Sequence, residues 1–458
     1  MARASLLERL GLHRPELRAW AMYDWANSAF VCVVVTAVFP IYFSRVAAQG
    51  LAPAVATARF GLATTLGLAL VALASPLLGA LADAGAMKKR LLAGSLALGA
   101  GATAGLFWVG PGDWRLGAAL FVLANVGLAA SFVAYDALLP HVARPDEVDR
   151  VSTAGYALGY LGGGLLLAVN LAWILAPARF GLPAGPGLDP WQATLPTRLA
   201  FLSVALWWVG FSIPLFRRVP EPPAASGRPS AHPVQEALAQ LALTGQAFRR
   251  HPQAARLMVA FLVYNDGIGT IIRMATLYGT ELGLGQQDLI AAVLLVQFAG
   301  IPFAFLFGAL AGKVGAKRAV LGSLVVYALI SVVGYFMRTA AHFFALAFMV
   351  AVVQGGSQAL SRSLFASLVP RRRSGEFFGF FSVMEKVAGI FGPGLFTLAV
   401  WLTGSSRAAI LSVIAFFAVG AWLLTRVDVE AGQRAAREAD EAGPSDEAEV
   451  EALRPPRG

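Results

Sequence analysis

The sequence predicts an all-α protein that crosses a membrane many times, and three observations lead to this fold class. Of its 458 residues, 57% are apolar and only 14% are charged, whereas soluble domains average about 45–50% and about 25%. The apolar residues gather in runs long enough to cross a bilayer. The two halves of the chain also share a loop motif at a fixed offset. A soluble domain and a disordered chain are both excluded, because neither accommodates so much apolar surface.

Twelve apolar runs have the length of about 20 residues that a helix needs to span the hydrocarbon. They cover residues 19–46, 57–82, 91–110, 114–139, 151–177, 197–216, 255–280, 286–312, 317–338, 341–369, 376–403 and 405–425. The first run is long enough to span, so it is not interpreted as a cleavable signal.

A polar break divides the twelve runs into two sets of six. We predict an N-terminal six-helix half at 1–216, a cytoplasmic central loop at 217–254 and a C-terminal six-helix half at 255–426. Within the loop, residues 234–250 could form an amphipathic helix on the cytoplasmic leaflet. The remaining residues, 427–458, are acidic and are expected to form a disordered cytoplasmic tail.

The distribution of Lys and Arg predicts the orientation. The N-terminus, the central loop and every second connection are rich in these residues. The alternate connections and span ends hold only Arg45, Arg59, Arg115, Arg179, Arg198, Arg338 and Arg407. Since basic loops stay on the cytoplasmic side, both termini are expected there, in the inner membrane if the cell is bacterial.

A loop motif occurs twice. Gly79-Ala-Leu-Ala-Asp83 follows the second run, and Gly308-Ala-Leu-Ala-Gly312 follows the eighth, 229 positions later. Gly163 and Gly392 are separated by the same distance. The offset is half of the chain length, so the two sets of six helices are interpreted as repeats, an arrangement that secondary transporters use.

The segment from Gly79 to Arg90 resembles the signature loop of the major facilitator superfamily, and its second copy resembles the degenerate one of that superfamily. Three further segments resemble the vacuole-effluxer-like branch, which includes fungal permeases that release amino acids from the vacuole. They are residues 20–30, 264–271 and 358–365. The resemblance implies a monomeric major facilitator that moves a small solute, amino acids among the candidates, by rocking its two halves.

Ionisable residues inside the spans are candidate functional groups, because each costs a few kcal/mol in the bilayer centre. Helices 1, 4, 7 and 10 line the cavity in this superfamily, which favours Asp24, Asp266 and Arg362. The two carboxylates suit a coupling proton, and Arg362 suits a substrate carboxylate or a lock with an aspartate. The other substrate-binding or coupling candidates are Tyr23, Asn27, Tyr264, Asn265, Arg273 and Gln358.

A cytoplasmic gate is predicted at the loop motif. Asp83, with Lys88, Lys89 and Arg90 nearby, is expected to hold the two halves together. Asp136 is expected to pair with the same basic cluster. Glu385 and Lys386 in the eleventh run are interpreted as a structural pair.

Several other classes of function are excluded or left as alternatives. No catalytic or metal-binding spacing occurs among the five histidines and one cysteine, and no cofactor is expected. The net charge of +10 lies in short loops instead of one basic face, so nucleic acid is not an expected partner. The expected partners are a small solute, protons and lipids. A uniporter, an exporter of a lipid-like or drug-like molecule, a non-transporting receptor or scaffold and a membrane enzyme remain alternatives.

Overall fold

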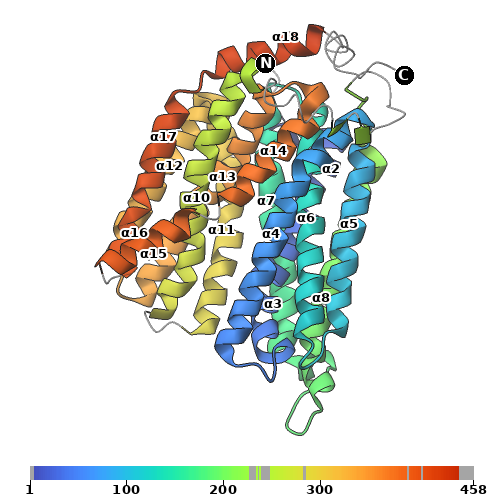
Figure 1. Ribbon diagram of the computed structural model, residues 1–458, viewed down its shortest axis with the longest axis vertical. Coiled ribbons are helices and arrows are strands. Elements are labelled where there is room, and N and C mark those ends of the chain that lie inside the picture. The colour runs from blue at the N-terminus through green and yellow to red at the C-terminus, as the bar shows by residue number, and fades with distance from the viewer. Residues whose placement is uncertain are drawn as a thin grey trace, which may run out of the picture.

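The computed structural model describes residues 5–225, 234–235, 237–238, 248–281, 285–388, 391–403 and 406–442. Its long helices run side by side in one bundle (Figure 1). The first half contains α2 (Pro15–Ala29), α3 (Phe39–Tyr42), α4 (Pro53–Ala84), α5 (Lys88–Gly105), α6 (Trp114–Val142), α7 (Val148–Leu175) and α8 (Pro190–Arg218). The second half contains α10 (Pro252–Glu281), α11 (Gln286–Val314), α12 (Ala316–Tyr335), α13 (Ala340–Leu368), α14 (Ser374–Val387), α15 (Phe391–Thr403), α16 (Ser406–Ser412) and α17 (Ile414–Thr425).

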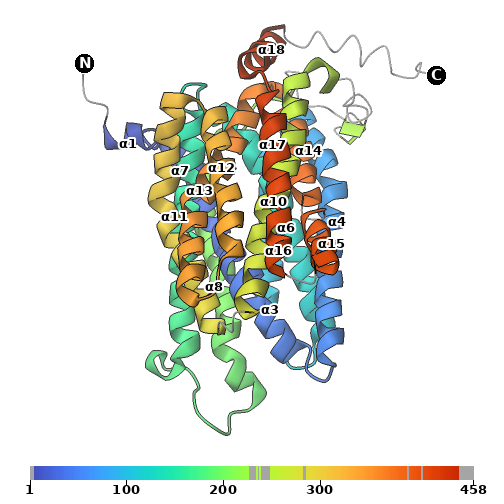
Figure 2. The same cartoon turned by 90° about the vertical axis from the view of Figure 1, so that its left-hand side faces the viewer.

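Two short helices lie outside the spans, α1 (Leu6–Arg9) and α18 (Val429–Ala442). Both lie at the same end of the bundle, which we call the terminal end (Figure 2). α4 and α5 are joined at this end by the predicted gate loop. Residues 226–233, 236 and 239–247 of the central loop, which include most of the predicted amphipathic segment 234–250, lie outside the described residues.

The predicted all-α fold of a multi-pass membrane protein is confirmed. Ten helical segments in the described part of the chain are each long and apolar enough to cross a membrane. The predicted spans 376–403 and 405–425 are each built from two helices, α14 with α15 and α16 with α17. Residues 389–390, between α14 and α15, lie outside the described residues.

The first span is also irregular. Beyond α2, residues Phe30–Val38 and Phe43–Ala47 form wider π-helical turns on either side of α3. Such turns are uncommon and occur often at functional sites. Apolar side chains of this stretch, such as Val33 and Phe39, are fully buried in the core of the first half.

The prediction of a disordered tail is wrong for Val429–Ala442, which form α18. The Asp428 side chain accepts a hydrogen bond from the Ala431 amide and begins the helix. Gly432 and Ala436 form a buried face, and Gly432 packs against Leu368 of α13. The Asp440 carboxylate also accepts hydrogen bonds from the loop before α14. These contacts stabilise a segment whose composition alone indicates disorder.

Candidate functional site

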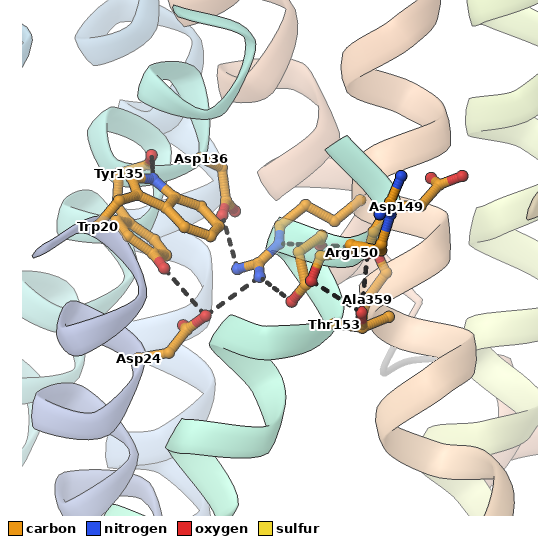
Figure 3. Close-up of polar contacts among 10 residues, drawn as sticks. Trp20, Asp24, Tyr135, Asp136, Asp149, Arg150, Thr153 and Ala359 are labelled. Carbon is orange, nitrogen blue, oxygen red and sulfur yellow. Dashed lines mark hydrogen bonds and ion pairs between the residues drawn. The ribbon is translucent and has the colours of Figure 1, made fainter. Parts of the chain in front are cut away.

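The side chain of Arg362 lies between the two halves and is 3% exposed. Its Nη2 donates to Asp24 Oδ2 at 3.1 Å, and its Nη1 donates to Asp136 Oδ1 at 3.2 Å. Its Nε donates to the Ser152 hydroxyl at 2.9 Å. Figure 3 shows the two carboxylates, Asp24 and Asp136, with dashed lines for these interactions. We call Arg362, Asp24, Asp136 and Ser152 the arginine cluster.

Aromatic rings enclose the cluster. The guanidinium carbon lies 4.8 Å from the ring centre of Trp20 and 4.6 Å from that of Tyr156. The Tyr135 hydroxyl donates to Asp24 at 2.9 Å. Rings of this kind stabilise a planar cation through their negative faces, and they exclude water from it. Arg362 is therefore held by charge, hydrogen bonds and stacking together.

Close packing at Gly155 of α7 brings α7 and α2 together beside the arginine cluster. A Cβ atom at this position would lie 2.4 Å from Asp24 Oδ2 and 3.1 Å from Arg362 Nη2. Only glycine leaves this space, so α7 can approach the Asp24 side of α2. Ser152, one turn earlier on α7, then faces Arg362 and also donates to the Ala359 carbonyl of α13.

The cluster joins the two halves of the protein. Arg362 is contributed by α13 of the second half. Asp24, Asp136 and Ser152 come from α2, α6 and α7 of the first half. Two carboxylates face one guanidinium, so the cluster carries one excess negative charge when both are ionised. Separating the halves at this point would break the three hydrogen bonds of Arg362 to Asp24, Asp136 and Ser152.

A second contact between the halves lies at the terminal end. The carboxylate of Asp83, at the end of α4, accepts hydrogen bonds from the Gly375 and Glu376 amides at 3.0 and 2.8 Å. These amides belong to the first turn of α14, where unpaired N–H groups favour an anion. Lys88 Nζ donates to the same carboxylate at 2.5 Å. Asp83 thus binds the second half directly.

The predicted pairing of Asp136 with the basic cluster is wrong. Asp136 binds Arg362, and Lys88 binds Asp83 instead. Lys89 Nζ donates to the Phe216 carbonyl within the first half, while Arg90 is exposed. The physical reason is depth: Asp136 lies nearly two turns inside α6, at the level of Arg362.

Other predicted site residues form contacts elsewhere. Tyr264 and Ser361 share a hydrogen bond of 2.6 Å, and Gln358 donates to Asn265 at 2.7 Å, so both pairs join α10 to α13. These four residues belong to the second half alone. These contacts lie within about one helical turn of Arg362 along α13.

Four predicted site residues remain. Asp266 is buried where α10 meets α15, beside Gly392. Tyr23 packs its ring 4.8 Å from that of Tyr135. Asn27 is buried, and its amide has no hydrogen-bond partner among the described residues. Arg273 belongs to α10, and its side chain lies outside the described residues.

Sequence reasoning missed Ser152, Tyr135 and Tyr156 as partners of Arg362. Ser152 is an ordinary small residue in an apolar span, and nothing in its neighbourhood marks it. Tyr135 precedes Asp136 directly, so a polar pair within an apolar run was the available signal. The pairing itself depends on the rotation of three helices, which periodicity does not determine.

Glu385 and Lys386 form the predicted pair, with 3.3 Å between the ammonium and the carboxylate. The Glu385 side chain is 44% exposed, although it lies three turns inside α14. No group of three or more His, Cys, Asp or Glu in the described part of the chain could hold a metal ion.

Comparison with known proteins agrees with this geometry. The chain matches the family described as "Vacuole effluxer Atg22 like" over residues 54–437. It is 34% identical to the uncharacterized MFS-type transporter YxiO of Bacillus subtilis, over 90% of this chain and 94% of that protein. It is 26% identical to autophagy-related protein 22 of Yarrowia lipolytica, over 63% of this chain and 51% of that protein. The chain thus spans about half the length of this fungal relative.

The fold also matches solved structures. The human organic anion transporter MFSD10 superposes with a TM-score of 0.67 at 14% identity, over 92% of this chain and all of that one. Two six-helix halves joined across a buried charge cluster define a membrane transporter of the major facilitator type. Within that class, the chain belongs to the vacuole effluxer Atg22-like family.

Proposed function

We propose that this protein is a secondary active transporter that moves a small solute by alternating access and couples this movement to protons. The observation that carries the proposal is the arginine cluster. Arg362 from one half binds Asp24 and Asp136 from the other. A transporter that alternates must close one end and open the other, and a buried contact between its halves can regulate that step.

The charges supply a route for proton coupling. One proton added to Asp24 or Asp136 would neutralise the cluster and remove an acceptor of Arg362. The contact between the halves would then weaken, and the terminal end could open. The proton would leave once the carboxylate met water on that side. Asp24 is 4% exposed in the closed arrangement, so proton exchange is gated by the same movement.

The orientation of the protein in the membrane and the identity of the solute are also part of the proposal. Both termini face the cytoplasm, as the Lys and Arg distribution favours, and the membrane is the inner one if the cell is bacterial. Closure by Asp83 then lies on the cytoplasmic side. Amino acids are the proposed solute because the family includes fungal vacuolar effluxers. The protein acts as a monomer, with lipids around its apolar helices.

Flux in proteoliposomes tests the proposal. Labelled leucine and tyrosine are followed with and without an imposed pH gradient, with empty liposomes as the blank. We expect uptake that the gradient drives and that unlabelled substrate competes away. Flux without gradient dependence would indicate a uniporter and would contradict the proposed coupling to protons. No flux from folded protein would exclude these two solutes.

Variants then assign the coupling residue. Asp24→Asn and Asp136→Asn are each expected to abolish gradient-driven flux while leaving exchange at equal pH. Asp266→Asn tests the other predicted carboxylate, and gradient-driven flux that survives it shows that Asp266 is not the proton carrier. Glu430→Gln on exposed α18 is the control, and it should transport like the unchanged protein.

A further inference from the structure

Glu385 and Lys386 are adjacent residues of opposite charge near the middle of the eleventh predicted span. The pair lies at the carboxyl end of α14, which ends at Val387. A helix carboxyl end carries partial negative charge, so it favours the ammonium of Lys386 and disfavours the carboxylate of Glu385. The carboxylate is nevertheless half-exposed at this depth. Such a charge is expensive in a membrane protein and is a candidate functional group.

The two side chains of the pair differ in exposure: Lys386 is 18% exposed and Glu385 is 44% exposed. Lys386 borders a cavity of about 80 Å³ between α4 and α6, and this cavity is mostly apolar. Its walls include Val71, Phe121 and Phe132, together with the polar side chains Thr64 and Asn125. The helix that carries the pair, α14, packs against α4 and against α6, which also carries Asp136 of the arginine cluster.

We infer that Glu385 and Lys386 form a binding site for a solute that carries both an ammonium and a carboxylate. Glu385 would accept the solute ammonium, and Lys386 would donate to its carboxylate. The cavity beside Lys386 would take a small apolar group of the same solute. This inference deepens the proposed function and rests on its claim that the chain binds a small solute.

The geometry of the pair also explains why the Glu385 carboxylate remains accessible to a ligand. Neighbouring residues on a helix point in different directions, so Glu385 and Lys386 cannot satisfy each other as well as two separate partners can. Their 3.3 Å contact leaves the carboxylate accessible. Binding would replace one poor ion pair by two charge-assisted hydrogen bonds.

Equilibrium binding to the purified protein in nanodiscs tests the site without any gradient. A panel of neutral L-amino acids is measured first. Leucine is then compared with isocaproate, which lacks its amine, and with isoamylamine, which lacks its carboxylate. We expect leucine to bind at least about tenfold more tightly than either, since one charge-assisted hydrogen bond contributes more than about 1.4 kcal/mol. The inference is overturned if no amino acid of the panel binds, or if leucine, isocaproate and isoamylamine bind equally well.

Single variants assign the two charges. Glu385→Gln should weaken leucine binding about tenfold and leave isocaproate unchanged, while Lys386→Met should weaken leucine and leave isoamylamine unchanged. Glu385→Asp keeps the charge and should stay within a few-fold. Glu430→Gln and Lys313→Met remove the same charges at exposed positions and should bind like the unchanged protein. If both site variants bind leucine normally, the site is wrong.

A misfolded variant is recognised by its elution profile, and the other site variant, Glu385→Gln or Lys386→Met, then carries the test. The two proposals fail separately. Loss of gradient dependence with intact binding contradicts proton coupling alone. Intact gradient-driven flux with unchanged leucine affinity in both site variants contradicts the binding site alone.

Discussion

Arg362 of α13 and Asp24 of α2 are 338 positions apart in the chain, and their side chains form a buried ion pair of 3.1 Å. The pair joins the first half of the transporter to the second half. Removing one partner leaves the other charge buried away from water. The effects of such a substitution on stability and on transport can be measured in separate experiments.

Arg362→Ala should lower the free energy of unfolding by about 3–5 kcal/mol, because it leaves two buried carboxylates facing each other. Asp24→Asn should cost less, since Arg362 keeps Asp136 and Ser152. The double variant should be more stable than the sum of the single effects predicts, by about 1–3 kcal/mol. Denaturation in detergent measures all three. Arg318→Ala, at an exposed position, is the control, and strict additivity would contradict the pairing.

Gly155→Ala should reduce transport as strongly as loss of Asp24. The added methyl group would lie 2.4 Å from Asp24 Oδ2 and would displace the ion pair. Gly94→Ala on α5 introduces the same methyl group where no atom lies within 4 Å, so its flux should be unchanged. Initial rates of gradient-driven flux compare the two. Equal rates would show that the space at Gly155 has no role in holding Asp24.

Asp83→Asn should favour the state that is open at the terminal end. An amide accepts hydrogen bonds on one atom only, so one of the Gly375 and Glu376 amides loses its partner and Lys88 loses its counter-ion. The measurement is thiol labelling of Ala359→Cys, buried between the halves, in a chain with Cys32→Ala. We expect faster labelling than in the parent. Asp146→Asn, exposed on the same face, should label like the parent, and an unchanged rate in Asp83→Asn contradicts the latch.

Glu147, between α6 and α7, gives a pH-dependent contribution to stability. Burial alone would raise the pKa of this carboxyl, but hydrogen bonds from Arg144 and the charge of Arg14 outweigh it and lower the pKa below its ordinary value. A lowered pKa means that the stabilisation is complete above about pH 4.5 and is lost as the pH falls through the folded value.

Glu147→Gln should therefore reduce the melting temperature at neutral pH, by an amount that shrinks steadily in acid. Thermal unfolding at a series of pH values between neutral and acid measures the difference from the parent. Asp146→Asn is again the matched control, because its side chain is exposed one position away. A difference that persists unchanged in acid would show that charge is not the cause.

The sequence by itself determined the class of fold and its long membrane-spanning helices, because the bilayer requires long apolar helices and leaves that requirement visible in composition. It also identified Asp24, Asp83 and Arg362 as unusual, since a charge in an apolar run is conspicuous. The partners of these residues were decided by the tertiary structure. Asp136 binds Arg362 instead of the basic loop, and Gly155 leaves the space for the contact between Asp24 and Arg362. Neither could be predicted, because helix rotation and close approach depend on side chains far apart in the chain.

The same reason explains the segment at 429–442. Its acidic composition indicates disorder, and only its contact with Leu368 and the loop before α14 makes it a helix. Local composition determines what a segment can bury. The surface that it meets decides whether it buries anything, and that surface exists only after the helices have assembled.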